Sequence, residues 1–283
     1  MTGGSLFSGC FGMEHGLERA GLCEIAWYAE IDKYASAVCK YHKPELRNYG
    51  DATKIDPAEL PDTDIITFGW PCQDNSIAGK RKGLAGGTRS SLLTEAVRII
   101  GAKKPKYFIA ENVPGLFSVN DGYDFYTAIK MLTDAGYDCQ WQVLNTIWFL
   151  PQNRERIYIV GHLRGQRRPE VFPIEHMPLN AKSFVARLDA QRHKKRIRND
   201  NNHQREHEST VQLYNNTRYL TPVECERLQG FPDNWTKYGM FDAGVKQISD
   251  TQRYKMAGNA VSVVVAEAIG TIIKGWLDDN AVD

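Results

Sequence analysis

A cysteine in a shaped turn is the residue best suited in this sequence to act as a nucleophile. Cys72 lies in Gly69-Trp70-Pro71-Cys72-Gln73, directly after the apolar run at residues 64–68, and the next apolar run leads into Glu111-Asn112-Val113-Pro114. Open α/β sheets bind their ligands at the carboxyl ends of the strands. We therefore expect the Cys72 thiol and the Glu111 carboxylic acid to share one cleft. The alternative for a lone cysteine is a small apolar core residue.

A glycine turn near the start of the chain is the second candidate for chemistry. Ser5-Leu6-Phe7-Ser8-Gly9-Cys10-Phe11-Gly12 joins an expected first strand to an expected helix. The backbone N–H groups of such a turn can approach a ligand at the helix N-terminus. Glu30 ends the second apolar run, where a carboxylate can accept hydrogen bonds from a ribose. Asp51 is a third possible cofactor contact. The glycine turn and Asp51 can also be purely structural.

Alternating strands and helices must position these residues. Residues 5–163 alternate short apolar runs with stretches of helical period, which predicts a parallel sheet flanked by helices. The expected buried strands are residues 64–68, 106–110 and 156–160, and the expected helices cover residues 92–100 and 125–132. Gly136 is the expected C-terminal stop of the second of these helices.

The character of the sequence changes after Gly161. Residues 164–217 hold eleven Lys or Arg against six Asp or Glu. Residues 193–198 have no apolar period and are expected to form an exposed loop. That charge run is either a solvated surface or a strip that binds phosphates.

Regular structure is predicted again at Thr221-Pro222-Val223-Glu224, which has the form of a capping box with proline at the first helical position. The helix should end near Gln229, because Gly230 favours a left-handed stop and Pro232 cannot continue a helix.

Composition excludes several classes of protein. The 283 residues include 35 Lys or Arg and 34 Asp or Glu, so a polyanion must be bound by a local patch rather than by net charge. The six cysteines lie 13 or more positions apart and predict neither a zinc site nor a disulfide framework. The most apolar segment, residues 261–277, is interrupted by Glu267 and Lys274. We expect a cytoplasmic protein without a metal or a membrane span.

Taken together, the sequence resembles the DNA cytosine-5 methyltransferases of bacteria and phages, through motifs that occur in the family's order. These motifs are Phe7-Ser8-Gly9-Cys10-Phe11-Gly12, Glu30-Ile31-Asp32, Pro71-Cys72-Gln73, Glu111-Asn112-Val113, Gln152-Asn153-Arg154-Glu155-Arg156, Arg227-Leu228-Gln229-Gly230-Phe231-Pro232 and Gly258-Asn259-Ala260-Val261. The resemblance implies a Rossmann-like sheet that binds S-adenosylmethionine, together with a small, reduced recognition domain. Two departures are Phe11, where the family usually has glycine, and Asn75, where it has a bulky apolar residue.

The resemblance also implies roles for the catalytic residues. Cys72 is the nucleophile that adds to cytosine C6, and Glu111 provides the proton needed at N3. Arg154 and Arg156 hold the cytosine O2, the phosphates and the cleft. The residues implied for S-adenosylmethionine are Phe7, Ser8, Gly9, Cys10, Phe11, Gly12, Glu30, Ile31, Asp51, Asn259 and Ala260. In this assignment Phe7 lies against the adenine, Glu30 binds the ribose, Asp51 lies near the adenine edge and Asn259 closes the pocket.

The implied substrate is double-stranded DNA, with the target cytosine flipped out of the helix. Residues assigned to DNA or substrate are Pro71, Gln73, Ser76, Asn112, Lys194, Lys195 and Arg196. Residues 76–88 are expected to close over the flipped base. We expect a catalytic domain at 1–189, completed by 250–283, and a recognition region at 190–249. Only residues 190–217, about 28 positions, remain for reading bases, which predicts loops and a short recognition site.

Some alternatives remain open at this point. The chain can be a DNA-binding homologue whose turnover is impaired by Phe11 and Asn75, or a methyltransferase that acts on cytosine in RNA. The family's RNA-specific Cys-Phe-Thr signature is not found. A partner restriction endonuclease is possible, and we expect the enzyme to work at the nucleoid of a bacterial or phage-infected cell.

Overall fold

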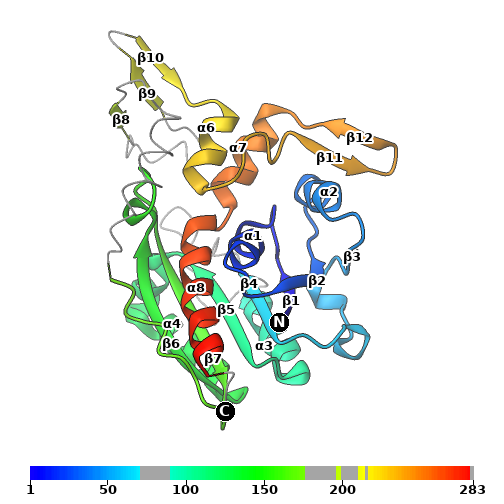
Figure 1. The fold of residues 1–283 in the computed structure, drawn as a ribbon, viewed down its shortest axis with the longest axis vertical. Helices are drawn as coiled ribbons and strands as arrows, with labels where there is room; N and C mark the ends of the chain where they lie inside the picture. The colour runs from blue at the N-terminus through cyan, green and yellow to red at the C-terminus, as the bar shows by residue number, and fades with distance from the viewer. Residues whose placement is uncertain (71–89, 176–195, 199–209, 214–215, 281–283) are drawn as a thin grey trace.

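A twisted sheet forms the centre of the computed structural model, which describes residues 1–70, 90–175, 196–198, 210–213 and 216–280. Within these residues the main sheet has seven strands in the order β3-β2-β1-β4-β5-β7-β6 (Figure 1). The strands are β1 Thr2–Leu6, β2 Glu24–Ala29, β3 Arg47–Asn48, β4 Ile65–Gly69, β5 Tyr107–Asn112, β6 Tyr137–Asn145 and β7 Glu155–Leu163.

The positions of the predicted strands are confirmed, but the predicted parallel direction is wrong for residues 156–160. The apolar runs at 64–68, 106–110 and 156–160 fall within β4, β5 and β7 to within one residue. β3, β2, β1, β4 and β5 pair in parallel, whereas β7 is antiparallel to both β5 and β6. The reason is the short connection between β6 and β7, which only an antiparallel pair can use. Strand β6 has no counterpart among the predicted strands.

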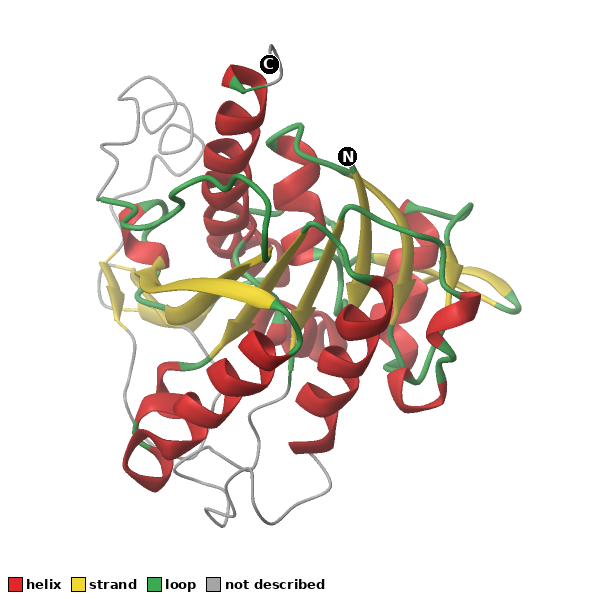
Figure 2. Ribbon diagram, turned by 90° about the horizontal axis from the view of Figure 1, so that it is seen from below, coloured by secondary structure: helices red, strands yellow, loops and turns green. Residues whose placement is uncertain are grey.

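Helices cover both faces of the sheet (Figure 2). The helices are α1 Gly12–Arg19, α2 Lys33–His42, α3 Ser90–Lys103, α4 Tyr123–Asp134 and α8 Val263–Asp279. Residues adjacent in a strand point to opposite faces, so Ile65 belongs to the core beneath α1 and α8, and Ile66 to the core beneath α3 and α4. Short 3-10 turns occur at Ala52–Lys54, Pro57–Glu59, Pro114–Phe117, Val119–Gly122 and Thr146–Trp148.

The predicted helices are confirmed as α3 and α4, and the backbone at Gly136 is left-handed just beyond the end of α4, as expected. The expected helix after the glycine turn is α1. The predicted capping box is also present: the Thr221 side chain accepts from the Glu224 amide at the start of α6 (Pro222–Gln229), and Gly230 ends the helix with φ of 87°. Helix α7 (Asp250–Asn259) follows and leads into α8.

Two small sheets lie outside the main one. Strands β8 (Arg196–Arg198), β9 (Thr210–Leu213) and β10 (Asn216–Tyr219) form an antiparallel sheet. The expectation of an exposed loop at 193–198 is therefore wrong for Arg196–Arg198, because pairing with the distant β9 gives this segment structure that local periodicity does not indicate. Strands β11 (Tyr238–Phe241) and β12 (Gly244–Gln247) form a hairpin, and β11 lies against α2.

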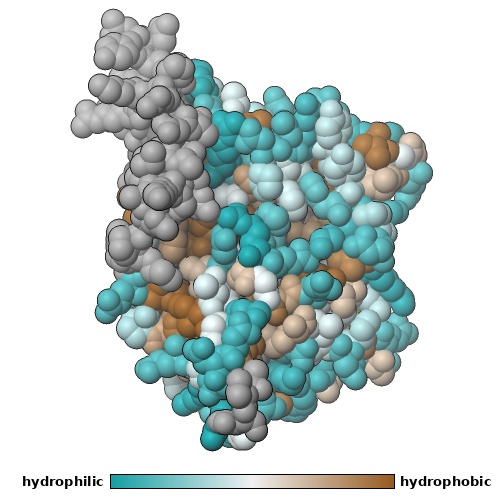
Figure 3. All heavy atoms as spheres, viewed as in Figure 1, coloured by the Kyte–Doolittle hydropathy of each residue, from teal (hydrophilic) through white to brown (hydrophobic). Residues whose placement is uncertain are grey.

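Helix α8 is a core helix by its packing. The α7–α8 segment Asp250–Asp279 is long and apolar enough to span a membrane, but 67% of its most apolar window is buried inside the protein. The visible face of the molecule carries separate hydrophobic areas among hydrophilic residues rather than a continuous apolar belt (Figure 3). The apolar residues of α8 are therefore accounted for by contact with α1 and the sheet.

The contact between α1 and α8 generates a stability prediction. A Cβ atom at Gly16 would lie 2.4 Å from the Val263 carbonyl oxygen and 2.7 Å from the Ala266 Cβ. Gly16→Ala should therefore destabilise the protein by about 1–3 kcal/mol, the usual cost of overpacking, although alanine is the better helix former. Urea denaturation of the two proteins measures the difference.

Gly101→Ala is the matched control, because Gly101 lies in α3 and a Cβ atom added there would have no neighbour within 4 Å. This variant should gain about 0.5–1 kcal/mol from helix propensity alone. Equal stability changes in the two variants would contradict the close packing of α1 on α8.

Candidate active site

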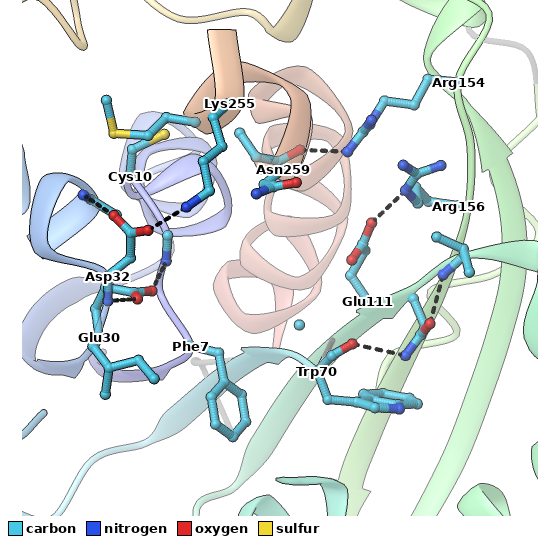
Figure 4. Close-up of a pocket in the computed structure, with 18 residues that line it drawn as sticks. Phe7, Cys10, Glu30, Asp32, Trp70, Glu111, Arg154, Arg156, Lys255 and Asn259 are labelled. Carbon is cyan, nitrogen blue, oxygen red and sulfur yellow. Dashed lines mark hydrogen bonds and ion pairs between the residues drawn. The ribbon is translucent and has the colours of Figure 1, made fainter. Parts of the chain in front are cut away.

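The site lies where the strand order reverses. The chain passes from β1 outward to β2 and β3 on one side and to β4 and β5 on the other, so the carboxyl ends of β1 and β4 flank a crevice. A cavity of about 470 Å³ opens there. Figure 4 shows Glu30, Asp32 and Lys255 on one side of it and Glu111, Arg154 and Arg156 on the other.

The structure brings together most of the predicted site residues that it describes. Those that line the cavity are Phe7, Gly9, Cys10, Glu30, Ile31, Glu111, Asn112, Arg154, Arg156, Asn259 and Ala260. Ser8, Phe11, Gly12 and Asp51 are described but are not in this lining. Pro71, Cys72, Gln73, Ser76, Lys194 and Lys195 lie outside the described residues, and Arg196 is placed by its backbone in β8.

The loop between β1 and α1 has an unusual backbone. Phe7, Gly9 and Phe11 have φ of 54°, 54° and 67°, in the left-handed region. Each costs about 1–2 kcal/mol for a residue other than glycine, and such strain persists where surrounding contacts hold it, typically at ligand sites. The glycine that the resemblance implies at position 11 would suit this conformation. Phe11 adopts it too, with its buried ring packed at 5.0 Å against Tyr28, away from the cavity lining.

The carboxylate of Glu30 stabilises this loop. One oxygen accepts from the Gly9 amide and the other from the Asp32 amide, each at 2.7 Å. Burial raises the pKa of Glu30, and these amide hydrogen bonds oppose that rise. Each carboxylate oxygen has a further lone pair. Glu30 can therefore still accept hydrogen bonds from hydroxyl groups in the cavity.

Chemically, this half of the cavity fits S-adenosylmethionine. Ile31 is 75% exposed and lines the cavity with Phe7, so two apolar side chains are available to a flat adenine ring. Gly9 has nothing within 4 Å of a Cβ position, which leaves its backbone open to a ligand. The carboxylate oxygens of Glu30 can accept hydrogen bonds from the hydroxyl groups of a ribose. The described residues thus provide an apolar surface beside a carboxylate, as a nucleoside requires.

Three of the predicted cofactor residues that do not line the cavity have other contacts. The Ser8 hydroxyl accepts from Ser5 at 2.7 Å beneath the loop. Gly12 allows α1 to approach the Val261 carbonyl oxygen, which would lie 2.3 Å from a Cβ. Asp51 caps the turn at Ala52–Lys54 by accepting from the Thr53 amide. Their contact with a cofactor stays a prediction.

An acid and two arginines form the other half of the site. The Glu111 Oε1 atom lies 3.0 Å from Arg156 Nε, and both side chains are largely buried. The other carboxylate oxygen lies over Gly69, 3.3 Å from where a Cβ would be. Burial raises the pKa of Glu111, and the charges of Arg156 and Arg154 oppose that rise without cancelling it. The Glu111 carboxyl group is therefore a weaker acid than that of an exposed glutamate.

Arg154 connects this half to the end of the chain. Its Nη2 donates to the Ala260 carbonyl oxygen at 2.8 Å, and burial lowers its pKa to about 10, so it stays charged at neutral pH. Because Ala260 joins α7 to α8, this bond brings the C-terminal helices to the edge of the sheet. Arg154 is thus placed by the fold as a fixed positive charge near Glu111.

Asn112 stabilises the point at which the Cys72 segment leaves the sheet. Its Nδ2 donates to the Trp70 carbonyl oxygen at 3.2 Å, while its Oδ1 accepts from the Val113 amide at 2.8 Å. Asn112 and Trp70 are both buried. The backbone just before Pro71 is therefore fixed beside Glu111, and Asn112 positions it.

Sequence reasoning missed Asp32 and Lys255 as individual site residues. Asp32 caps α2 through the amides of Tyr34 and Ala35, and its Oδ2 accepts from Lys255 Nζ at 2.8 Å. Burial alone would raise the pKa of Asp32, but the bonds from Lys255 and from these amides outweigh it and lower the pKa. An aspartate just before a helical stretch was the available signal for the cap. No local signal in the sequence indicated that Lys255 would pair with Asp32.

Comparisons with known proteins identify the family of this chain. The model of the family described as C-5 cytosine-specific DNA methylase matches residues 1–212 and 176–275. The Type II methyltransferase M1.ScrFI of Lactococcus lactis subsp. cremoris is 33% identical over 304 residues, covering 93% of this chain and 75% of the relative. The Type II methyltransferase M.NlaX of Neisseria lactamica is 33% identical over 312 residues, covering 96% of each.

A solved structure extends the comparison to the fold. The S. pombe Dnmt2 methyltransferase superposes with a TM-score of 0.71 at 18% identity, over 98% of this chain and 99% of that one. This likeness confirms the predicted Rossmann-like methyltransferase sheet. The family match over most of its length and the two 33% identical relatives show that the chain belongs to the C-5 cytosine-specific DNA methylase family.

Proposed function

We propose that this DNA cytosine-5 methyltransferase acts through a covalent adduct between Cys72 and cytosine C6. The observation that carries the proposal is the Glu111–Arg156 pair beside the fixed Trp70 backbone, which leads directly to Pro71 and Cys72. An acid, a fixed cation and the start of the cysteine turn thus meet at one edge of the sheet. Cytosine C5 is too weak a nucleophile to be methylated without such activation.

The proposed reaction begins at the thiol and ends with its release. The Cys72 thiolate forms a bond to C6, and the displaced ring electrons reach N3, which takes a proton from Glu111. C5 is then electron-rich and forms the bond to the methyl group. The N3 proton then returns to the Glu111 carboxylate, solvent water takes the proton from C5, and breakage of the C6–S bond restores the ring and releases the Cys72 thiolate. S-adenosylmethionine supplies the methyl group on its positive sulfur when it is bound.

Glu111 suits this role because its environment retains the proton. Burial raises its pKa, so more of the acid is protonated at neutral pH than in an exposed glutamate. Arg156 fixes Oε1 and leaves Oε2 on the side of Gly69 for the base. The two guanidinium groups are already oriented, so they stabilise charge on the ring without reorganising.

Several assignments around the cavity form part of the proposal. Phe7 would lie against the adenine, Glu30 would bind the ribose and Asp51 would approach the adenine edge. Asn259 would close the cavity from α7, where Arg154 fixes the neighbouring Ala260. These contacts are supported by the position of Phe7, Glu30 and Asn259 in the lining.

For DNA, the proposal needs base flipping, since a paired cytosine cannot reach this cavity; the cost is about a few kcal/mol. Residues 76–88 would close over the base, and Gln73 and Ser76 would contact it.

The proposed domains are 1–189 with 250–283 for catalysis and 190–249 for recognition. A cognate restriction endonuclease is a further proposal, which the names of the Type II relatives support, and a site of action at the nucleoid in the cytoplasm is another.

Replacing the nucleophile gives the first test. Cys72→Ser should abolish methyl transfer to DNA, because a serine hydroxyl is a far weaker nucleophile than a thiolate. The Kd for S-adenosylmethionine, measured by calorimetry, should stay within about twofold, since the thiol acts only on the base. Cys139→Ser, on β6, should keep its activity. Methyl transfer by Cys72→Ser would rule out the covalent route.

Glu111 gives the second test. Glu111→Gln should lower kcat by about 10²–10⁴-fold, the range of general acid catalysis, with little change in DNA affinity. In the wild type, kcat should fall as the pH rises through the raised pKa of Glu111, because the protonated acid is lost. The variant should lack this fall. The control is Glu155→Gln, at an exposed position on β7; a wild-type pH profile in Glu111→Gln would make Glu111 structural.

The basic run near β8 gives the third test. Neutralising Lys194, Lys195 and Arg196 together should weaken binding to all DNA sequences. It should also reduce the slope of log K against log salt by about 0.9 for each phosphate that the protein no longer neutralises. A matched triple variant at Lys103, Lys104 and Lys106, which precede β5 at the opposite edge of the sheet, should leave the slope unchanged. Bisulfite sequencing of a methylated random DNA library tests the expected short recognition site, and a defined site of six or more base pairs would contradict it.

A further inference from the structure

Trp235 lies outside the cavity lining but contacts the loop that forms it. The indole Nε1 donates to the Cys10 carbonyl oxygen at 2.8 Å, across 225 positions of sequence. Trp235 follows α6, whereas Cys10 precedes α1 and lines the cavity. A side chain from the distant part of the chain therefore bonds to the backbone of the cofactor loop.

The loop needs such contacts because its backbone is strained. Left-handed conformations at Phe7 and Phe11 persist only where neighbouring groups hold them, whereas Gly9 adopts its φ of 54° without strain. Two contacts hold Gly9: its amide donates to Glu30, and its carbonyl oxygen accepts from the Cys39 thiol at 3.2 Å. Among the described residues, Trp235 is the side chain that bonds the Cys10 carbonyl oxygen.

Trp235 is itself held firmly. Its ring stacks on His42 with centroids 3.7 Å apart and planes 10° from parallel, and His15 lies 4.5 Å away. The Trp235 carbonyl oxygen lies 2.7 Å from His42 Nε2. Because that oxygen can only accept, His42 Nε2 carries the proton. The indole N–H is thus presented to Cys10 in one fixed orientation.

The residue after Trp235 is anchored in the protein interior. The Thr236 amide donates to Glu226 at 3.0 Å, and Arg253 pairs with the same carboxylate oxygen at 2.9 Å. All three side chains are buried. This cluster joins α6, α7 and the segment between them, so the anchor of Trp235 belongs to the C-terminal part of the fold.

We propose that Trp235 is a positioning residue for S-adenosylmethionine, which holds the cofactor loop in its binding conformation through the Cys10 carbonyl oxygen. The inference rests on the proposed cofactor site. Without the indole N–H, the free protein would populate loop conformations that do not bind the cofactor. Apparent affinity falls in proportion to the fraction of molecules that remain competent.

The test is Trp235→Phe, which keeps an aromatic ring for His42 but removes the N–H. KM and Kd for S-adenosylmethionine should rise about three- to tenfold, the effect of losing one ordinary hydrogen bond. Both kcat and KM for DNA should stay at wild-type values, because the loop is ordered once the cofactor is bound. Hydrogen exchange at the amides of residues 8–12 should be faster in the cofactor-free variant.

Trp27→Phe is the matched control. Trp27 is fully buried on β2, and its indole nitrogen has no hydrogen-bond partner among the described atoms. This variant should lose stability by creating a cavity, yet keep its KM for S-adenosylmethionine. If both variants raise KM in step with lost stability, the role of Trp235 is structural and the proposal is wrong.

A second variant covers the case in which Trp235→Phe does not fold. Benzothienylalanine at position 235 keeps the size of the indole and replaces its N–H with sulfur. It should show the same rise in KM. An unchanged Kd and KM in a folded variant would overturn the positioning role, whereas a wild-type protein that fails to bind S-adenosylmethionine would overturn the proposed cofactor site instead.

Discussion

The antiparallel pairing of β5 with β7 is the constraint on which the catalytic half of the site depends. In this register Glu111 lies opposite Tyr158, and Asn112 lies opposite Ile157. The last residues of β5 therefore meet the first residues of β7, which places Arg154 and Arg156 beside Glu111. A parallel β7 would begin at the other edge of the sheet and carry both arginines away from the acid.

The resulting ion pair between Glu111 and Arg156 is better explained by a role in catalysis than by a contribution to stability. Burying two charges costs several kcal/mol, and a buried pair often contributes no net stability. The Glu111–Arg156 pair nevertheless sits at the carboxyl edge of the sheet, next to the cavity. There it combines a carboxylic acid whose pKa is raised by burial with two guanidinium groups that lie beside it. Arg154 extends the arrangement to Ala260, so the junction of the C-terminal helices is hydrogen-bonded to the same edge of the sheet.

Local patterns in the sequence predicted much of this structure. Apolar runs gave the positions of β4, β5 and β7, and capping residues gave both ends of α6. The motifs gave Glu30, Glu111 and the arginines. Strand direction was not predictable in this way, since residues 156–160 are equally apolar in either direction. Pairings between residues far apart in the sequence were also missed, because they depend on tertiary structure that local patterns do not indicate. These pairings join Lys255 to Asp32, Arg196–Arg198 to β9, and Trp235 to Cys10.

The central claim is that Cys72 forms a covalent bond to cytosine at this edge of the sheet, and 5-fluorocytosine tests it most directly. Fluorine at C5 cannot leave as a proton does, so the adduct should persist after methyl transfer. Wild-type enzyme with S-adenosylmethionine and a random DNA library containing 5-fluorocytosine should give a complex that survives denaturant, and mass spectrometry should locate the link on the peptide containing Cys72. A link at another cysteine, or no stable complex from an enzyme that methylates ordinary DNA, would contradict the mechanism.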